Sequence, residues 1–199
     1  MNDLPELFQS RRSIRRYESR PVPQAIIDRL LESAVWAPSA HNRQPWRFVV
    51  ITTANAKQKL AGAMGEALRR DLAADGLSRT AIDRDANRSY TRLTGAPLLI
   101  LVCLTMADMD EYPDERRNRN EALMAAQGAA MAGQNLMLSA HALGLGACWL
   151  CAPLFCPEIV REALDLPADW QPQGVITVGY PAETKEKTRH PIGTRVLYR

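Results

Sequence analysis

The densest group of residues that could bind an anion lies near the start of the chain, at Arg11-Arg12-Ser13-Ile14-Arg15. Guanidinium groups donate paired, charge-assisted hydrogen bonds to phosphate, and a serine hydroxyl adds a further donor. The same groups would stabilise an anionic ring that forms during a reduction. Taken alone, the segment could also be a solvated basic turn. A second basic pair, Lys187 and Arg189, lies in the polar tail, where it could complete an anion site or contribute only to solubility.

A second segment of interest is the loop APSAHNRQPW, residues 37–46. Two prolines disfavour helix at the residues before them, so the loop is expected to be rigid. Its exposed backbone and the amides of Asn42 and Gln44 could hydrogen-bond the edge of a flat heterocycle. An ordinary turn is the alternative interpretation.

The segment GLGACWLCAPLF, residues 144–155, contains both a backbone donor and a C-x-x-C pair. Leu154 offers a backbone N–H, whereas Pro153 has none to give. Cys148 and Cys151 could be a redox dithiol or half of a zinc site. Their apolar context instead predicts small buried residues of a core strand, and we expect no metal.

No conventional catalytic set accompanies these segments. The histidines His41, His141 and His190 are far apart, and the serine-hydrolase, phosphate-loop and dinucleotide-binding motifs are absent from the sequence. If the protein is an enzyme, a bound cofactor is expected to carry the chemistry.

The elements that must position these residues follow from hydrophobic spacing. It predicts helices over residues 4–10, 24–36, 119–143 and 157–164, with one charged, alanine-rich helical region over 54–93. Short apolar runs predict strands at 46–52, 97–104, 147–152 and 173–179, the second of them buried and central. The small residues of the segment 119–143 suit a helix inside one core or at a subunit interface. This order of elements predicts an α+β fold in a single domain, residues 1–199.

Composition excludes several classes of protein. Apolar residues make up 46% and charged residues 24% of the 199 positions, as in soluble globular domains. The 25 basic residues are scattered and offset by 22 acids, which argues against nucleic-acid binding. No apolar run approaches the roughly 20 residues of a membrane span. The N-terminal residues lack a secretion signal, so a cytoplasmic protein is expected.

Taken together, the basic-basic-Ser-x-basic opening and the P-S-x-x-N-x-Q-P-W loop resemble the signature of the nitroreductase family, in the same order from end to end. The resemblance implies a sandwich with a central mixed or antiparallel sheet flanked by helices, in an intertwined homodimer that binds FMN at its interface. It implies an FMN-dependent oxidoreductase in which the flavin N5 carries hydride, with NADH or NADPH as electron donor. The cofactor-binding residues that it implies are Arg11, Arg12, Ser13, Arg15, Pro38, Ser39, Ala40, Asn42, Gln44, Pro153, Leu154, Lys187 and Arg189.

The resemblance also implies individual roles. Arg11, Arg12 and Ser13, with the pair in the tail, would hold the phosphate and ribityl chain, and Arg15 would face the N1/O2 edge of the flavin. Residues 38–40 would come from the partner subunit. Many relatives have an acidic residue and a glycine where this chain has Pro153-Leu154, so the Leu154 N–H is the expected but unusual donor to N5.

Within the family, the stretches LVCLTMADMDEYPDERR and GACWLCAPLFCPEIVREALDLPADW resemble the C-terminal reductase domain of the bifunctional coenzyme F-420 gamma-glutamyl ligase. This implies reduction of a dehydro precursor of that coenzyme, without the ligase activity. The alternatives are a broad NAD(P)H-dependent reductase of nitroaromatics or quinones, the branch that fragments reduced flavin with oxygen, and a non-catalytic flavin- or deazaflavin-binding module. The expected substrate residues are His41, Arg70, Asp71 and Arg88.

Overall fold

Strand β2 (Leu98–Leu104) is the centre of the fold, and all seven of its residues are buried. The computed structural model describes residues 4–199. β2 pairs antiparallel with β1 (Trp46–Ile51) on one side and with β4 (Gln171–Gly179) on the other. β3 (Gly146–Leu150) pairs antiparallel with β4, so the sheet order is β1-β2-β4-β3. The expected central sheet is therefore confirmed, in its antiparallel form.

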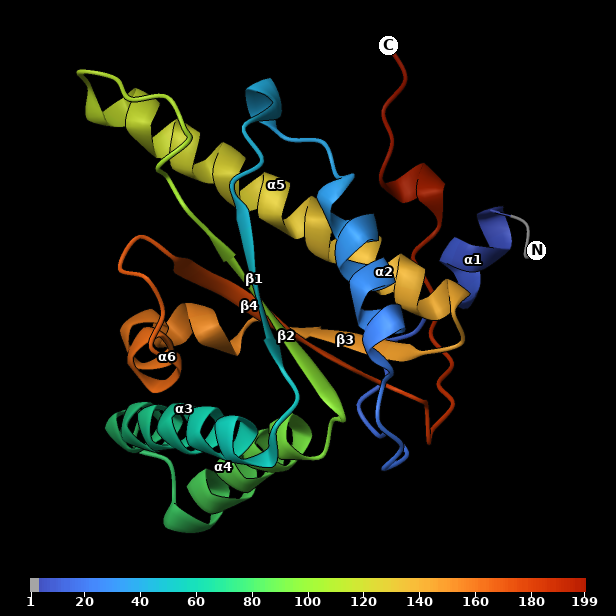
Figure 1. Ribbon diagram of the computed structural model, residues 1–199, viewed down its shortest axis with the longest axis vertical. Helices are drawn as coiled ribbons and strands as arrows, with labels where there is room; N and C mark the ends of the chain where they lie inside the picture. The colour runs from blue at the N-terminus through green and yellow to red at the C-terminus, as the bar shows by residue number, and fades with distance from the viewer. Residues whose placement is uncertain (1–3) are drawn as a thin grey trace.

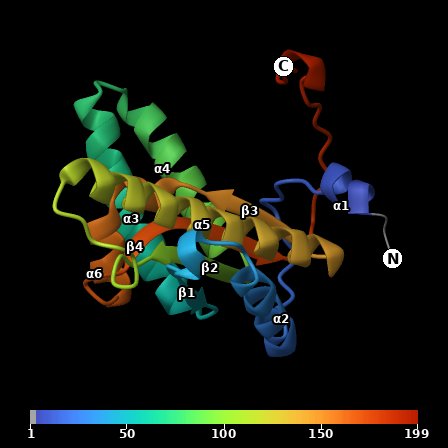
Figure 2. The same ribbon diagram turned by 90° about the horizontal axis from the view of Figure 1, so that it is seen from above.

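Helices cover both faces of this sheet (Figures 1 and 2). Because successive residues of a strand point to opposite faces, Ile100 and Val102 face one layer and Leu99 and Leu101 the other. The first layer contains α2 (Gln24–Val35) and α5 (Glu115–Ala142). The second contains α3 (Ala54–Ala74), α4 (Arg79–Thr94) and α6 (Pro157–Leu164). A short helix α1 (Leu4–Ser10) and the 3-10 turns η1 (Ala40–Asn42), η2 (Ala152–Phe155) and η3 (Ile192–Thr194) complete the elements.

Two of the expected helices have different bounds. The region 54–93 forms two helices rather than one, because the chain turns at Gly76, whose φ of +77° favours glycine, and restarts where the Ser78 hydroxyl accepts from the Ala81 N–H. The long helix begins at Glu115 rather than near Arg119. Asp114 caps it by accepting from the Arg117 N–H at 3.0 Å.

Helix α5 packs closely on the sheet because of its small residues. A Cβ added to Gly133 would lie 2.3 Å from the ring of Trp149 in β3, and one added to Gly174 would lie 2.4 Å from the same indole. The Trp149 ring therefore lies between two glycines, and a side chain at either position would clash with it. Among residues 4–199, no helix is long and apolar enough to cross a membrane.

Candidate functional site

Residues from the two ends of the described chain meet around one cavity of about 240 Å³. We call this group the basic cradle; it consists of Arg11, Arg12, Ser13, Arg15, Lys185, Lys187 and Arg189. Figure 1 shows the chain after α1 and the C-terminal segment running side by side near the β3 edge of the sheet, and Figure 2 agrees. Both basic segments singled out in the sequence thus contribute to a single site, and Lys185 joins them.

The charges of the basic cradle are incompletely neutralised by the protein. Arg11 Nη1 and Arg12 Nε are buried, and neither atom has a hydrogen-bond partner among residues 4–199. Burial lowers the pKa of Arg11, and the neighbouring charge of Arg189 lowers it further. A buried donor without a partner is costly. An anion bound in the cradle would supply that partner and offset the repulsion between the guanidinium groups.

Backbone pairing positions the N-terminal half of the cradle. Ser13 forms an isolated parallel bridge with Ala147 of β3, and the Ile14 N–H donates to the Ala147 carbonyl at 3.1 Å. The Ile14 side chain lies where a Cβ on Gly146 would come within 2.7 Å, so a glycine there lets the segment approach the strand. The basic segment is therefore built onto the edge of the sheet and is not a free turn.

Two side chains fix the rest of this segment. The Tyr17 hydroxyl donates to the Thr177 carbonyl at 3.0 Å and shares a hydrogen bond of 2.7 Å with Thr177 Oγ1. Burial raises the pKa of Tyr17 above its ordinary value, so this phenol stays protonated. On the other side, Glu183 Oε1 accepts from the Arg15 N–H at 2.7 Å, and Glu183 Oε2 lies 3.4 Å from Lys185 Nζ.

Sequence reasoning missed three residues at this site. Lys185 and Glu183 lie just before the expected pair Lys187 and Arg189, and the alternating charges of that tail were the available signal. His141, in the last turn of α5, lines a neighbouring cavity of about 290 Å³ and has its Nε2 2.8 Å from the Ser10 hydroxyl. Burial and the charges of the adjacent arginines lower the pKa of His141, which favours its neutral form.

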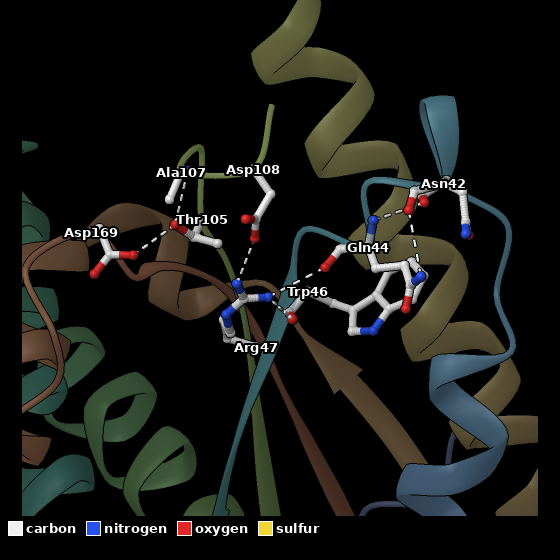
Figure 3. Close-up of polar contacts among 9 residues, drawn as sticks. Asn42, Gln44, Trp46, Arg47, Thr105, Ala107, Asp108 and Asp169 are labelled. Carbon is white, nitrogen blue, oxygen red and sulfur yellow. Dashed lines mark hydrogen bonds and ion pairs between the residues drawn. The ribbon is translucent and has the colours of Figure 1, made fainter. Parts of the chain in front are cut away.

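The loop of residues 37–46 adopts an unusual backbone conformation, shown in Figure 3. His41, Asn42 and Gln44 have φ values of 50°, 56° and 51°, in the left-handed region that non-glycine residues rarely occupy. The Ser39 hydroxyl accepts from the Gln44 N–H at 2.9 Å and closes the turn. Backbone strain of this kind is concentrated at functional sites, so three such residues in one loop make it a candidate binding loop.

Residues of β1 and of the segment after β2 hold this loop in place (Figure 3). Arg47 donates to the carbonyls of Gln44 and Trp46 at 3.3 and 2.9 Å and pairs with Asp108 at 2.8 Å. The Thr105 N–H donates to the Pro45 carbonyl at 2.9 Å. These contacts attach the loop to β1 and to the segment that follows β2.

Within one chain, this loop and the basic cradle lie at separate places along α5. Ser39 and Pro45 approach α5 at Gly128, where an added Cβ would be 3.5 Å and 3.6 Å from their side chains. The cavity beside the cradle is lined by Met137 and His141 of the same helix. At 1.5 Å per residue these contacts are roughly 14–20 Å apart along the helix. The loop residues and the cradle residues therefore form two separate groups in the single chain.

The third expected segment, Pro153-Leu154, lies in η2. The Leu154 N–H already donates to the Cys151 carbonyl at 3.0 Å. It is therefore not free to donate to an external acceptor in this conformation, which weakens its assignment as the donor to N5. Its side chain is half exposed.

The four expected substrate residues do not share one cavity. Asp71 lies on the wall of an apolar cavity of about 270 Å³ between α3 and η2, whereas Arg88 of α4 lines a different cavity of about 510 Å³. Arg70 is exposed on α3, and His41 is exposed in the strained loop. Only Arg88 lines a cavity that also includes cradle residues, Arg15 and Lys185.

The cysteines are free thiols with different environments. Cys148 is buried in β3, as expected, but Cys151 is exposed because the strand ends at Leu150. Burial raises the pKa of Cys148. Within residues 4–199, no group of three or more His, Cys, Asp or Glu side chains is arranged to hold a metal ion.

Comparison with known proteins agrees with this fold. Residues 8–180 match the model of the Nitroreductase family. A Methanothermobacter thermautotrophicus protein carrying the name NADH dehydrogenase/NAD(P)H nitroreductase is 30% identical over 98% of this chain and 83% of its own length. The 5,6-dimethylbenzimidazole synthase of Rhodospirillum rubrum is 31% identical over 95% of this chain and 84% of its own length. A crystal structure from Desulfovibrio desulfuricans, described as a nitroreductase in complex with FMN, superposes with a TM-score of 0.77 at 29% identity, over 100% of this chain and 98% of that one.

Proposed function

Because the chain belongs to the nitroreductase family, we propose that it is an FMN-dependent oxidoreductase that uses NADH or NADPH to reduce small conjugated acceptors such as nitroaromatics and quinones. The relatives support this proposal, since one carries the name NAD(P)H nitroreductase and a similar structure contains FMN. FMN supplies hydride transfer at its N5 atom when it is bound. The protein binds and orients it.

The observation that carries the proposal is the basic cradle. A phosphate monoester carries close to two negative charges and three acceptor oxygens near neutral pH. The two buried guanidinium atoms without partners, Arg11 Nη1 and Arg12 Nε, need such acceptors. The Ser13 segment, Lys187 and Arg189 complete the lining. The residues present therefore fit the phosphate of FMN.

Arg15 has a separate role in this proposal. It is held by Glu183 through its backbone N–H and lines both the cradle and the cavity next to α4. A fixed positive charge there would stabilise a flavin ring that becomes anionic on reduction. Among the residues that the structure describes, the Arg15 guanidinium donates one hydrogen bond, from Nη1 to the Ser13 carbonyl at 3.2 Å, so its other N–H groups are left to interact with the ring.

We further propose that two copies of the chain complete the site. The strained loop, with Pro38, Ser39, Ala40, Asn42 and Gln44, is remote from the cradle of its own chain, so it would serve the cradle of the partner. The outer face of α5 exposes Leu123 and Met131, which are 58% and 39% exposed in the single chain. This helix packs with α2 on one face of the sheet (Figures 1 and 2). A second copy covering that face would bury these side chains.

The proposal also concerns the identity of the electron acceptor. Reduction of a dehydro precursor of coenzyme F-420 finds no counterpart among the relatives described above, so broad reduction of nitroaromatics and quinones is the main proposal. The chain is 31% identical to a 5,6-dimethylbenzimidazole synthase, and this similarity makes oxygen-dependent conversion of reduced flavin the second candidate. Loss of flavin absorbance during turnover would identify that second activity.

The first experiment is the visible spectrum of the purified protein, before and after addition of FMN, with the released flavin quantified. About one FMN per chain, bleached by NADH or NADPH and restored by a nitroaromatic, is the expected result. No flavin and no binding of added FMN would overturn the proposal. Tight FMN binding without reduction by either nucleotide would instead indicate a flavin-binding module.

A further inference from the structure

The cavity next to the basic cradle is lined by six cationic side chains. We call it the arginine chamber: its volume is about 510 Å³, and its cations are Arg15, Arg16, Arg84, Arg88, Arg92 and Lys185. Arg84, Arg88 and Arg92 recur every four residues along α4, so they share one face of that helix. Arg15 and Lys185 belong to the cradle as well. The two sites are therefore neighbours with a shared wall.

Two carboxylates face these six cations. Asp85 lies 3.2 Å from Arg84 Nε and 3.0 Å from Arg88 Nη2, and Glu183 accepts from the Arg15 N–H and pairs with Lys185. Within residues 4–199, the guanidinium groups of Arg15, Arg16 and Arg92 form no ion pair with Asp or Glu. The chamber therefore keeps an excess of positive charge. Like charges gathered in a concave site raise the local concentration of anions and repel one another in their absence.

The chamber also lies close to the sheet edge that carries the cradle. Arg88 and Arg92 of α4 and Arg15 and Arg16 of the N-terminal segment line it together. The charges of Arg15 and Arg92 both act on the thiol of Cys148 in β3, opposing the rise in its pKa that burial causes. Arginines from α4 and from the N-terminal segment thus face a common space above this strand.

We propose that the arginine chamber binds the anionic part of the acceptor, so that the preferred substrates carry at least two carboxylate or phosphate charges. This inference rests on the proposed function and narrows its substrate class. A guanidinium binds carboxylate and phosphate with paired hydrogen bonds, and several guanidiniums at once select for polyanions. A neutral nitroaromatic would reach the same flavin but would leave the chamber's charges unpaired.

The test compares two acceptors that share one reducible ring, 5-nitroisophthalate, a dianion, and its neutral diamide. In the FMN-loaded protein, kcat/KM is expected to favour the dianion by about tenfold or more, and the preference should fall as salt screens the charges. The double variant Arg88→Gln/Arg92→Gln should lower the ratio of the two kcat/KM values by about tenfold, equivalent to ~1.4 kcal/mol. Arg79→Gln is the matched control, because Arg79 lies on the same helix outside the chamber and its side chain is 97% exposed.

Citrate and pyrophosphate distinguish the two chemical sources of charge. Each is titrated into the FMN-loaded protein while the flavin spectrum is followed, so that the tighter ligand identifies carboxylate or phosphate as the preferred group. An unchanged acceptor ratio in the double variant, or an equal loss in Arg79→Gln, would overturn the inference. If the protein binds no FMN, the proposed function fails, and equilibrium dialysis of pyrophosphate against the wild type and the double variant still decides whether the chamber binds polyanions.

Discussion

The backbone N–H of Arg15 donates a hydrogen bond of 2.7 Å to Oε1 of Glu183, and this contact ties the N-terminal basic segment to the C-terminal tail. The side chain of Glu183 is only 14% exposed. The hydrogen bond from Arg15 and the charge of Lys185 together outweigh the effect of burial and hold the pKa of Glu183 below its usual value. The ionised carboxylate thus holds Arg15 and Lys185 of the basic cradle in position.

Replacement Glu183→Gln tests this contact through its pH dependence. Because the folded-state pKa is depressed, the stabilisation is fully present above the unfolded-state pKa of about 4.3 and is lost as pH falls through the lower folded-state value. The variant should therefore unfold at a lower temperature than the wild type at pH 7, and the difference should shrink near pH 3.5. Melting temperatures from circular dichroism measure it. A difference that is the same at both pH values would show that the charge of Glu183 is not involved.

Arg11→Gln should weaken FMN binding without destabilising the flavin-free protein. A charge-assisted hydrogen bond contributes about 1.5–3 kcal/mol, so the Kd for FMN should rise by roughly 10- to 100-fold. The melting temperature of the flavin-free variant should not fall, because Arg11 Nη1 is buried without a partner and lies near other arginines. Fluorescence titration with FMN gives the Kd, and Arg29→Gln, on the exposed face of α2, is the control.

Met131→Glu should separate the proposed dimer into monomers that also bind FMN poorly. A carboxylate on the outer face of α5 would lose its hydration at the interface. Light scattering after size exclusion gives the mass of the particle. Leu77→Glu is the matched control, since Leu77 is 38% exposed against 39% for Met131 but lies between α3 and α4. A monomeric Met131→Glu protein that keeps full FMN affinity would contradict a shared site.

Gly133→Ala and Gly62→Ala should have opposite effects on the free energy of unfolding. Replacing a helical glycine with alanine gains about 0.8–1.0 kcal/mol where there is space, and nothing lies within 4 Å of a Cβ at Gly62. At Gly133 the new methyl group would lie 2.3 Å from Trp149, so overpacking should cost about 1–3 kcal/mol. Urea unfolding measures both. Stabilisation by both substitutions would mean that the Trp149 ring moves aside freely.

Cys103 should resist thiol reagents that label Cys151. Burial raises the pKa of Cys103 to about 12, and the residue is fully buried in β2. The reactive species is the thiolate, so labelling of Cys103 at pH 8 should follow global unfolding. Mass spectrometry of peptides after timed alkylation separates the two sites. Labelling of Cys103 at the rate of Cys151 would show that β2 opens locally.

The elements of the fold were readable from the sequence because local patterns determine them. The run PLLILVCL predicted a buried central strand, and β2 is buried at every residue. The division of the region 54–93 into two helices did not follow from the sequence, because Gly62, Gly65 and Gly76 all interrupt its helical spacing and only Gly76 of the three has a positive φ. The exposure of Cys151 was missed because an apolar sequence context does not reveal where a strand ends.

The sequence by itself determined which residue types the site contains: a basic segment with a serine, a proline-bounded loop with two amides, and a basic pair in the tail. Only the tertiary structure decided that the two basic segments share one cavity, that Lys185 and Glu183 belong to it, and that the loop lies apart from it. The physical reason is that antiparallel pairing of β3 with β4, and the bridge from Ser13 to Ala147, bring both ends of the chain to one sheet edge. Pairing between strands depends on contacts distant in sequence, which no local pattern encodes.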